Sequence, residues 1–470
     1  MVHFRPALGL IAIAVAALTP VARSSQPVLC SVEGGLDQTI RERVGLTAYT
    51  LQTLSLPDAA GEYVAFELTL SERVVRINVS LDPVDSPGCT MILDDGSGSP
   101  REVPAPAPCT YRGDVVGQPG SVVSGSILGG QFTGIVVLPG EQGAWNVLPL
   151  DQASPGADRA KHIVSRFEDS VAGNWRCGVA DDAPVMPGLV PASAAPTLPG
   201  HTDLPYLCEI AIDADYQYFQ QLNNSSSAVA QDISTVIANA SSYAILSGCN
   251  LRFRIVRYVI RTSSAGNPGL YNTNDPTLLL QGLRQVWANL GNSIPRDITH
   301  MFTGRELSGV TIGIAYLGNV CSVTYGYALN QSRFSLQPGR RAAVAAHEIG
   351  HNFTARHCDD PGHLCTPCWL MTASQGNTTN ELTRYGCATS IITGYIPTRN
   401  CIQPGDSGAP LQGAGCGADF DHSGTLSAND FAAFSAAMAA MDWRADIDSS
   451  GRLDINDYIA FLTAYSRGCR

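Results

Sequence analysis

The segment with the clearest chemical potential is HEIGHNFTARHCDD, residues 347–360. Residues four positions apart share one face of an α-helix, so His347 and His351 would present two imidazoles to one point. Glu348 follows the first histidine and can reach a metal-bound water without being a ligand itself. In this HExxH arrangement, zinc lowers the pKa of water and the glutamate takes the proton. The pattern therefore predicts a hydrolytic zinc site.

Two further residues make a chance match to this short motif a poorer explanation. His357 lies six residues after His351, and Met371 follows in the stretch CTPCWLMTAS. Met371 is equally well explained as an ordinary core methionine, because both interpretations place it in an apolar environment. We expect other histidines, such as His300 and His363, to be structural or surface residues.

The histidine segment and Met371 together resemble the metzincins, particularly the reprolysin/ADAM family. Residues 297–329 resemble that family's substrate-binding edge strand, and residues 109–138 resemble its propeptide. The resemblance covers most of the chain between Arg73 and Cys401, weakly at first and strongly around the histidines.

The resemblance implies a zinc endopeptidase. His347, His351 and His357 would bind zinc, and Glu348 would act as general base and later as proton donor to the leaving amine. Zinc would polarise the scissile carbonyl and stabilise the tetrahedral oxyanion. Met371 would form the hydrophobic floor beneath the metal.

Thr354 departs from the family pattern, which usually has glycine between the second and third histidine. Glycine lets the chain leave the helix with positive φ, which other L-residues resist at a cost of roughly 1–2 kcal/mol. A β-branched residue is among the poorer substitutes. Metal binding of order 10 kcal/mol in apparent free energy would hold such a strained turn. We therefore expect a functional three-histidine site with a locally altered turn.

The tetrapeptide RCGV, residues 176–179, is similar to the cysteine switch of metzincin zymogens. A thiolate is a good zinc ligand, so Cys177 would occupy the position that the catalytic water needs. It also precedes a segment that a protease could cut, as a zymogen requires. The alternative is that Cys177 pairs with Cys30 while Cys89 pairs with Cys109, and the number of cysteines does not separate the two interpretations.

The elements that would position these residues alternate between strands and helices. Runs of apolar and β-branched residues predict strands at 209–214, 251–261, 297–304 and 310–318. Apolar periodicity and end signals predict helices at 228–246, 276–290 and 340–351. Asp275 is expected to cap the second helix, with Pro276 in its first turn. This alternation predicts an α/β metzincin catalytic domain with a mixed, largely parallel sheet and an active-site helix.

Two similar loops near the end of the chain, DFDHSGTLSAND and DIDSSGRLDIND, begin 27 residues apart. Each has oxygen side chains at positions 1, 3, 5, 9 and 12 and glycine at position 6, which is the EF-hand calcium-loop pattern. Aspartate at position 12 resembles dockerin-type loops. The expected calcium ligands are Asp419, Asp421, Ser423, Thr425, Asp430, Asp446, Asp448, Ser450, Arg452 and Asp457. Cys416 and Cys469 bracket this module and could join its ends.

The chain is therefore predicted to be multidomain, with a β-rich prodomain, the catalytic domain and a small all-α calcium-binding module. Short alternating runs such as 64–71 and 74–81 indicate the β-rich part. Segments rich in Pro, Gly and Ala indicate the linkers. The predicted boundaries are signal peptide 1–24, propeptide 25–179, linker 180–203, peptidase domain 204–401, linker 402–415 and calcium module 416–470.

Composition and charge limit the class of protein. The 470 residues are 44% hydrophobic, which is enough for packed cores in two to four units. There are 29 basic and 41 acidic residues and no basic run, so we do not expect nucleic acid as a partner.

Export is indicated by an apolar run from Ala7 to Leu18 after Arg5, which is typical of a secretory signal. No later segment is long and apolar enough to predict a membrane span. Fourteen cysteines in a secreted protein point to disulfides, and the ten from Cys208 onward could close five bridges.

Three hypotheses about function follow. The first is a secreted zinc-dependent endopeptidase, made as a zymogen, that acts on a protein or peptide substrate. The second is a catalytically inactive metzincin-fold protein whose calcium module binds a protein partner. The third is a structural zinc site, but such sites avoid the open coordination position expected here. Glu348 favours the first hypothesis, because a binding protein has no need of the base, and only Thr354 favours the second.

Overall fold

The computed structural model describes residues 34–58, 60–180, 205–290, 293–376, 381–404, 420, 427–439, 445 and 453–467. The predicted signal peptide, most of both predicted linkers and most of the predicted calcium loops lie outside these residues. We call residues 34–180 the N-terminal region and residues 205–404 the central region.

The first sheet is built entirely from the N-terminal region, as the alternating runs predicted. Its antiparallel strands follow the order β1-β10-β9-β8-β7-β6-β3-β2. Their bounds are β1 Thr50–Thr53, β2 Tyr63–Leu70, β3 Arg73–Leu81, β6 Thr110–Val115, β7 Val122–Leu128, β8 Gln131–Val137, β9 Trp145–Pro149 and β10 Lys161–Arg166. Alternate residues of β2, such as Phe66 and Leu68, are buried in the core of this sheet.

The second sheet is mixed, in the order β11-β15-β16-β14-β12-β13-β4-β5, with β17 also paired to β12. Its strands are β4 Asp85–Asp94, β5 Arg101–Pro104, β11 Arg176–Ala180, β12 Tyr206–Ala214, β13 Leu251–Arg261, β14 Ile298–Phe302, β15 Thr311–Tyr316, β16 Tyr327–Asn330 and β17 Gln403–Pro404. All pairs are parallel except β15–β16, β4–β5 and β12–β17. The predicted mixed, largely parallel sheet is confirmed.

The helices also follow the sequence closely. They are α1 Gly34–Ile40, α2 Leu150–Ala153, α3 Tyr216–Gln221, α4 Ser226–Leu246, α5 Pro276–Leu290, α6 Pro338–Asn352, α7 Thr389–Tyr395, α8 Ala428–Ala439 and α9 Ile455–Arg467. Asp275 caps α5 as predicted, because its Oδ1 accepts a hydrogen bond from the Leu278 amide at 2.9 Å.

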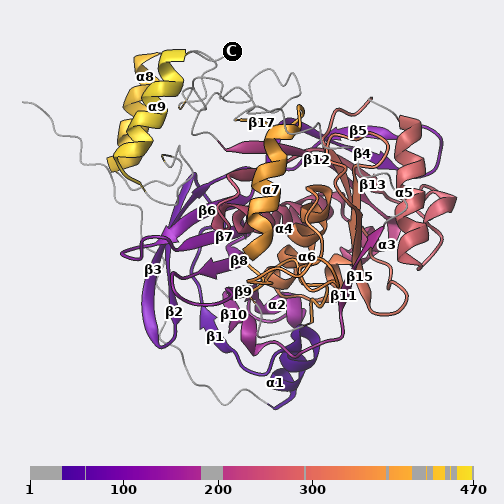
Figure 1. Cartoon of the computed structure of the whole chain (residues 1–470). Coiled ribbons are helices and arrows are strands. Elements are labelled where there is room, and N and C mark those ends of the chain that lie inside the picture. The colour runs from indigo at the N-terminus through magenta and orange to yellow at the C-terminus, as the bar shows by residue number, and fades with distance from the viewer. Residues whose placement is uncertain are drawn as a thin grey trace, which may run out of the picture.

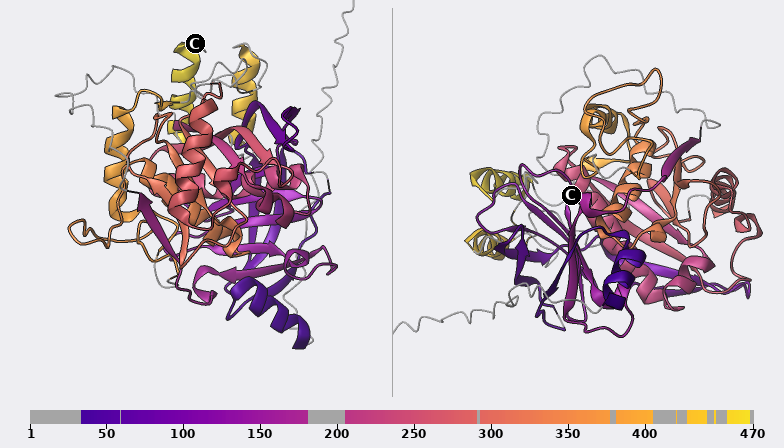
Figure 2. Two further views of the ribbon diagram at one scale, coloured as in Figure 1. Left: turned by 90° about the vertical axis from the view of Figure 1, so that its right-hand side faces the viewer. Right: turned by 90° about the horizontal axis from the view of Figure 1, so that it is seen from below.

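Residue 180 does not divide the molecule into two independent sheets. β4 and β11 come from the N-terminal region but pair with strands of the central region, and β5 joins the same sheet through β4. Figure 1 shows β4 and β5 beside β13, on the opposite side of the molecule from β2 and β3. Figure 2 shows the remaining N-terminal strands, in indigo to purple, gathered on one side and the orange central segments on the other. Sequence alternation reports a strand but not its partner, so this crossing was not predicted.

The structure has three disulfides among the residues described, Cys321–Cys401, Cys358–Cys368 and Cys365–Cys387. The expectation of five bridges from Cys208 onward is wrong, because Cys208 and Cys249 carry free thiols. Both are buried in the apolar core, where cysteine packs as a small hydrophobic residue. Cys416 and Cys469 lie outside the described residues.

The two C-terminal helices pack through aromatic side chains. The rings of Phe434 on α8 and Phe461 on α9 are stacked with centroids 4.3 Å apart. Asp430 and Asp457 are fully buried at the helix starts, where each accepts a backbone hydrogen bond from the residue three positions earlier. The predicted calcium ligands Asp419, Asp421, Ser423, Thr425, Asp446, Asp448, Ser450 and Arg452 lie outside the described residues.

Within the part of the chain that the structure describes, no helix combines the length and apolarity needed to cross a bilayer.

Helix α6, which carries the HExxH motif, is buried along its whole length and is tied to α4 by a charged cluster. Arg341 on α6 pairs with Asp232 on α4 at 2.5 Å, and Arg333 pairs with the same carboxylate at 3.3 Å. Burial alone would raise the pKa of Asp232, but Arg341 and Arg333 outweigh it and lower this pKa to about 2.

We predict that Asp232→Asn lowers the free energy of unfolding at pH 7 by about 2–4 kcal/mol, because it leaves Arg341 buried without its counter-charge. The pKa of Asp232 is lower in the folded than in the unfolded protein. The stabilisation is therefore present above about pH 4 and is lost as the pH falls towards 2. Urea unfolding at several pH values measures it. Glu168→Gln, in an exposed pair with Arg166, is the control and should change little. Equal losses in both variants would contradict the argument.

Candidate metal centre

Helix α6 and the turn after it bring together the three predicted histidines. His347 and His351 lie four residues apart on α6, and their ring centroids are 4.6 Å apart. The ring of His357 lies 5.2 Å from that of His347 and 4.8 Å from that of His351. One ring nitrogen of each lies within 4.8 Å of the others, and all three residues are buried. The sequence prediction that these imidazoles converge is confirmed.

Each ring is oriented through its Nδ1 atom. The Nδ1 of His347 lies 2.7 Å from the Leu370 carbonyl oxygen, and that of His351 lies 2.6 Å from the Ala355 carbonyl oxygen. The Nδ1 of His357 lies 3.3 Å from a carboxylate oxygen of Asp360. These acceptors require the proton on Nδ1, so the Nε2 lone pairs are left free.

The three Nε2 atoms are buried and have no hydrogen-bond partner. Burial lowers the pKa of His347 to about 3 and moves the pKa of His351 and His357 in the same direction. Three neutral imidazoles with converging lone pairs fit a zinc ion, whereas unpartnered buried nitrogens would otherwise be costly.

Glu348 is also fully buried, and its carboxylate interacts with the thiol of Cys177. Burial raises the pKa of this carboxyl group. Gly313 on the neighbouring strand β15 makes room for it, because a Cβ atom at that position would overlap the Glu348 side chain. A carboxylate beside the histidines that is not itself tied up in an ion pair can exchange a proton once the Cys177 thiol has left.

Thr354 adopts the left-handed conformation that was expected of glycine, with φ of 68°. Its amide bonds the His351 carbonyl oxygen at 2.9 Å, and the Ala355 amide bonds the Gly350 carbonyl oxygen at 3.1 Å. These two bonds form a Schellman motif, which ends α6. The motif also delivers the Ala355 carbonyl group to the ring of His351. The turn therefore keeps the geometry that glycine would have provided.

Met371 is fully buried against α6, an observation that fits both a core methionine and the floor of a metal site. A Cβ atom on Gly350 would lie 2.8 Å from the Met371 sulfur, so this glycine allows the close approach.

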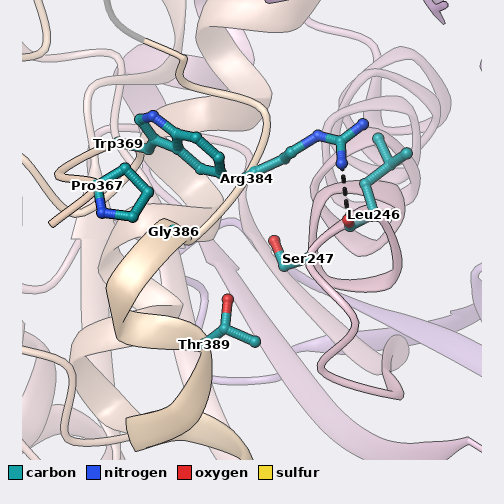
Figure 3. Close-up of a pocket in the computed structure, with 7 residues that line it drawn as sticks. All are labelled: Leu246, Ser247, Pro367, Trp369, Arg384, Gly386 and Thr389. Atoms are coloured by element: carbon teal, nitrogen blue, oxygen red, sulfur yellow. Dashed lines mark hydrogen bonds between the residues drawn. The ribbon is translucent and has the colours of Figure 1, made fainter. Parts of the chain in front are cut away.

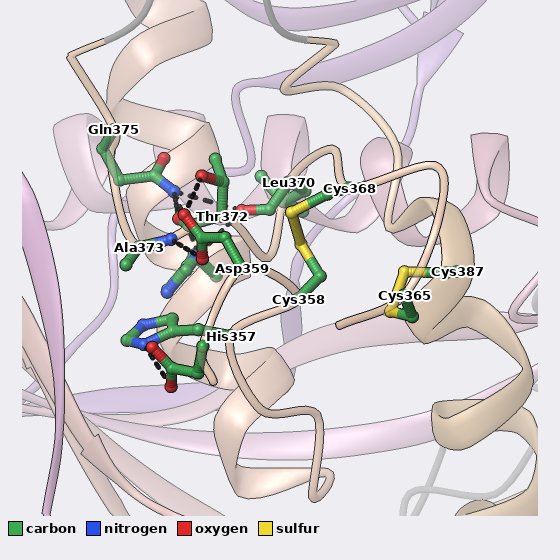
Figure 4. The surroundings of a disulfide bond; sticks show 12 residues. His357, Cys358, Asp359, Cys365, Cys368, Leu370, Thr372, Ala373, Gln375 and Cys387 are labelled. Atoms are coloured by element: carbon green, nitrogen blue, oxygen red, sulfur yellow. Dashed lines mark hydrogen bonds and ion pairs between the residues drawn. A yellow bond between two sulfur atoms is a disulfide. The ribbon is translucent and has the colours of Figure 1, made fainter. Parts of the chain in front are cut away.

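Residues beyond the sequence predictions hold the loop that contains Met371, and Figure 4 shows several of them. Asp359 accepts hydrogen bonds from the Thr372 hydroxyl and the Ala373 amide, both at 2.9 Å. The Gln375 side-chain amide donates to the Thr372 carbonyl oxygen at 2.7 Å and to that of Leu370 at 3.1 Å. Asp359 was recognisable only as a neighbour of His357, and Gln375 carried no signal in the sequence.

Cys177 lies at the same site. Its sulfur lies within 4.8 Å of a His347 ring nitrogen and of a Glu348 carboxylate oxygen. The thiol is free, and burial, followed by the neighbouring Glu348 carboxylate, raises its pKa. Cys89 and Cys109 also carry free thiols, so the alternative pairing of these two cysteines is wrong for this structure.

The segment around Cys177 lies between strand β15 and the loop after Met371. β11 pairs in parallel with β15, with Cys177 opposite Gly313. On the other side, the Cys177 amide donates to the Ala373 carbonyl oxygen at 3.0 Å. β11 therefore fills the outer edge of β15.

The other predicted residues lie away from this centre. His300 is buried in β14, where its Nε2 lies 2.6 Å from the Asn330 side-chain oxygen, and His363 is exposed. A cavity of about 300 Å³ lies between the end of α4 and the loops before α7 (Figure 3). Its lining includes Trp369 and Arg384 but none of the three histidines, so it is separate from the metal centre.

Comparison with known proteins agrees with this geometry. Residues 205–390 match the reprolysin-type model of Metallo-peptidase family M12. Disintegrin and metalloproteinase domain-containing protein 15 of Mus musculus is 27% identical over 339 residues, which cover 68% of this chain and 36% of that protein. Disintegrin and metalloproteinase domain-containing protein 10 of Mus musculus is 25% identical over 305 residues, which cover 55% of this chain and 40% of that protein.

The chain spans about a third of the length of the first curated relatives it matches. The matched domain and these relatives support the metzincin/ADAM family and a zinc metallopeptidase, and the histidine triad supports zinc.

We predict that Thr354→Gly raises the free energy of unfolding by about 0.5–1 kcal/mol. Glycine removes left-handed strain of roughly 1–2 kcal/mol but increases the entropy of the unfolded chain. Denaturant unfolding of the metal-loaded protein measures the difference. Thr354→Ala keeps the unfavourable φ and is the matched control. If alanine stabilises as much as glycine does, the strain lies in the branched side chain and not in the backbone.

Proposed function

We propose that this chain is a secreted zinc-dependent endopeptidase made as a zymogen. The observation that carries the proposal is the convergence of three buried, unpartnered Nε2 atoms beside the buried carboxylate of Glu348. A structural zinc site would have four protein ligands and no need of an adjacent base.

His347, His351 and His357 would hold the zinc ion, which supplies Lewis-acid chemistry by lowering the pKa of water and polarising a carbonyl group. Glu348 takes the proton of the attacking water on a carboxylate oxygen and returns it to the leaving amine. The outer edge of β15 binds the peptide by strand addition, through backbone hydrogen bonds. Gly313 keeps this strand close to Glu348.

Latency would come from Cys177 and the strand that carries it. β11 takes the backbone groups of β15 that a substrate needs, and the sulfur lies beside Glu348 and His347. The Cys177 thiolate would be the fourth zinc ligand and exclude the attacking water. Cleavage in residues 181–204, the proline- and alanine-rich stretch, would precede activity.

The C-terminal helix pair would belong to a dockerin-like calcium module. Asp430 and Asp457 lie at equivalent positions of the sequence repeat, and both are buried at a helix start. Secretion is supported by the disulfides of the central region, because such bonds persist in oxidising compartments.

We predict that Glu348→Gln in linker-cleaved protein slows casein hydrolysis roughly 10²–10⁴-fold, the usual contribution of a general base. Zinc bound per chain should stay unchanged, because the histidines remain. Removing the metal with a chelator should abolish activity in the wild type, and zinc should restore it. Glu306→Gln changes an exposed glutamate and should retain activity. Full activity in Glu348→Gln, or no activity in folded, zinc-loaded wild type, would count against the proposed function.

We predict that Cys177→Ser raises the peptidase activity of the uncut protein at least about tenfold, which corresponds to roughly 1.4 kcal/mol of lost inhibition. A serine hydroxyl is a far poorer zinc ligand than a thiolate. Casein hydrolysis before any linker cleavage measures the effect. Cys109→Ser replaces another buried thiol of the N-terminal region and should stay latent. Equal latency of the two variants would mean that β11, and not the sulfur, blocks the site.

A further inference from the structure

The N-terminal region extends the sheet of the central region on the side remote from Cys177. β4 pairs in parallel with β13, where Arg257 to Arg261 lie opposite Thr90 to Asp94, and β5 pairs with β4 (Figure 1). Without this β4–β5 hairpin, β13 would be an edge strand with a row of unpaired backbone groups.

Polar contacts at its boundary fix the hairpin in this position. The Asp85 carboxylate accepts hydrogen bonds from the Tyr258 hydroxyl on β13 and from the Ser234 hydroxyl on α4. Arg261 on β13 pairs with Asp94 at 2.7 Å. Departure of the hairpin would take these carboxylates away from the buried groups of Tyr258 and Arg261 on β13 and of Ser234 on α4, which is unfavourable.

A shared ion cluster adds to this interface. Asp82 of the N-terminal region pairs with Arg252 on β13 at 2.5 Å and with Arg112 on β6 at 3.0 Å. Burial would raise the pKa of Asp82, but Arg252 and Arg112 outweigh it and keep this pKa below its usual value. The carboxylate is therefore charged at neutral pH and needs both arginines.

The same boundary is also apolar. Met91, Ile135 and Phe167 of the N-terminal region belong to one buried cluster with residues of α4 and α6. Asn146 accepts a hydrogen bond from the Gly339 amide, the second residue of α6, at 2.7 Å. Removal of the N-terminal region would expose a continuous core to water.

Residues 171–180 make much smaller contacts. The Cys177 side chain belongs to a separate cluster with Ile312 and Val344, against which Trp175 packs. Beyond that cluster, the Arg340 guanidinium lies over the Trp175 ring, the Val171 amide bonds the Gly45 carbonyl oxygen, and the other backbone bonds go to β15 and to the loop after Met371. The segment that pairs with the outer edge of β15 can therefore leave while the larger interface stays in place.

We propose that residues 34–170 remain bound after cleavage as a noncovalent subunit of the active enzyme, and that only residues 171–180 leave the outer edge of β15. The β4–β5 hairpin is then a permanent part of the sheet, and its partner is the edge of β13. The inference rests on the proposed zymogen, because it concerns which part of the N-terminal region must leave.

The test uses the full chain with one site-specific protease sequence placed within residues 181–204 and another between Ser170 and Val171. Cutting at both sites removes the short segment alone. We expect residues 34–170 to co-elute one-to-one with the central region in size-exclusion chromatography, and the doubly cut enzyme to hydrolyse casein. Hydrogen exchange should find the amides of β13 as protected after cutting as before.

Separate elution of the N-terminal fragment, with activity in the central region alone and lost protection of β13, would overturn the inference but leave the proposed function intact. A persistent complex that binds zinc but hydrolyses nothing would overturn the proposed function instead.

Asp85→Ala should speed dissociation of the cut fragment at least about tenfold. Asp95→Ala, in the exposed turn of the hairpin, is the matched control and should not. Equal dissociation rates of the two variants would contradict the role given to Asp85. If Asp85→Ala does not fold, the hydrogen-exchange protection of the β13 amides in the unmutated protein decides the proposal.

Discussion

A histidine ring can offer its Nε2 lone pair to a metal only while its proton is held on Nδ1, and much of the central region serves that constraint. His347 depends on the carbonyl group of Leu370, 23 residues along the chain, so the loop that follows the motif must fold back beneath α6. His351 depends on Ala355, which is delivered by the left-handed turn at Thr354. The strained residue is thus linked to a ligand through one hydrogen bond, and its cost is accepted where metal binding can offset it.

The arrangement around the metal centre also depends on the outer edge of β15. A sheet edge is a ready template for another strand, and here the chain supplies that strand itself as β11. The same pairing brings Cys177 opposite Gly313, the residue whose missing Cβ lets β15 approach Glu348. The pairing of β11 with the edge of β15 and the position of the Cys177 sulfur beside the metal centre therefore follow from one strand register.

Much of this site was predictable because its signals are local. The spacing of His347 and His351 on a helix follows from helix geometry, and the positive φ of Thr354 follows from where the chain must turn. The carbonyl acceptors were not predictable, since every residue has a carbonyl group and only the fold selects one. Cys208 and Cys249 misled the disulfide count for the same reason: burial in a core and pairing with a partner look identical in sequence. Strand pairing across regions, as for β4 and β13, has no local signal either.

The N-terminal region therefore acts on the metal centre in two ways: residues 171–180 cover it, and the residues before them support helix α6. Helix α6 contains the run AAVAA, and small side chains bury little area each, so the helix needs close neighbours on every side. The N-terminal region provides one of those sides, where Asn146 bonds Gly339 and where Arg340 lies over the ring of Phe167. The same guanidinium also lies over the ring of Trp175, in the segment 171–180 that pairs with the edge of β15. Helix α6 is therefore covered both by residues before 171 and, at Val344 and Arg340, by Cys177 and Trp175. For the edge of β15 to open while the first of these covers stays in place, the chain must turn away from the helix between Phe167 and Trp175.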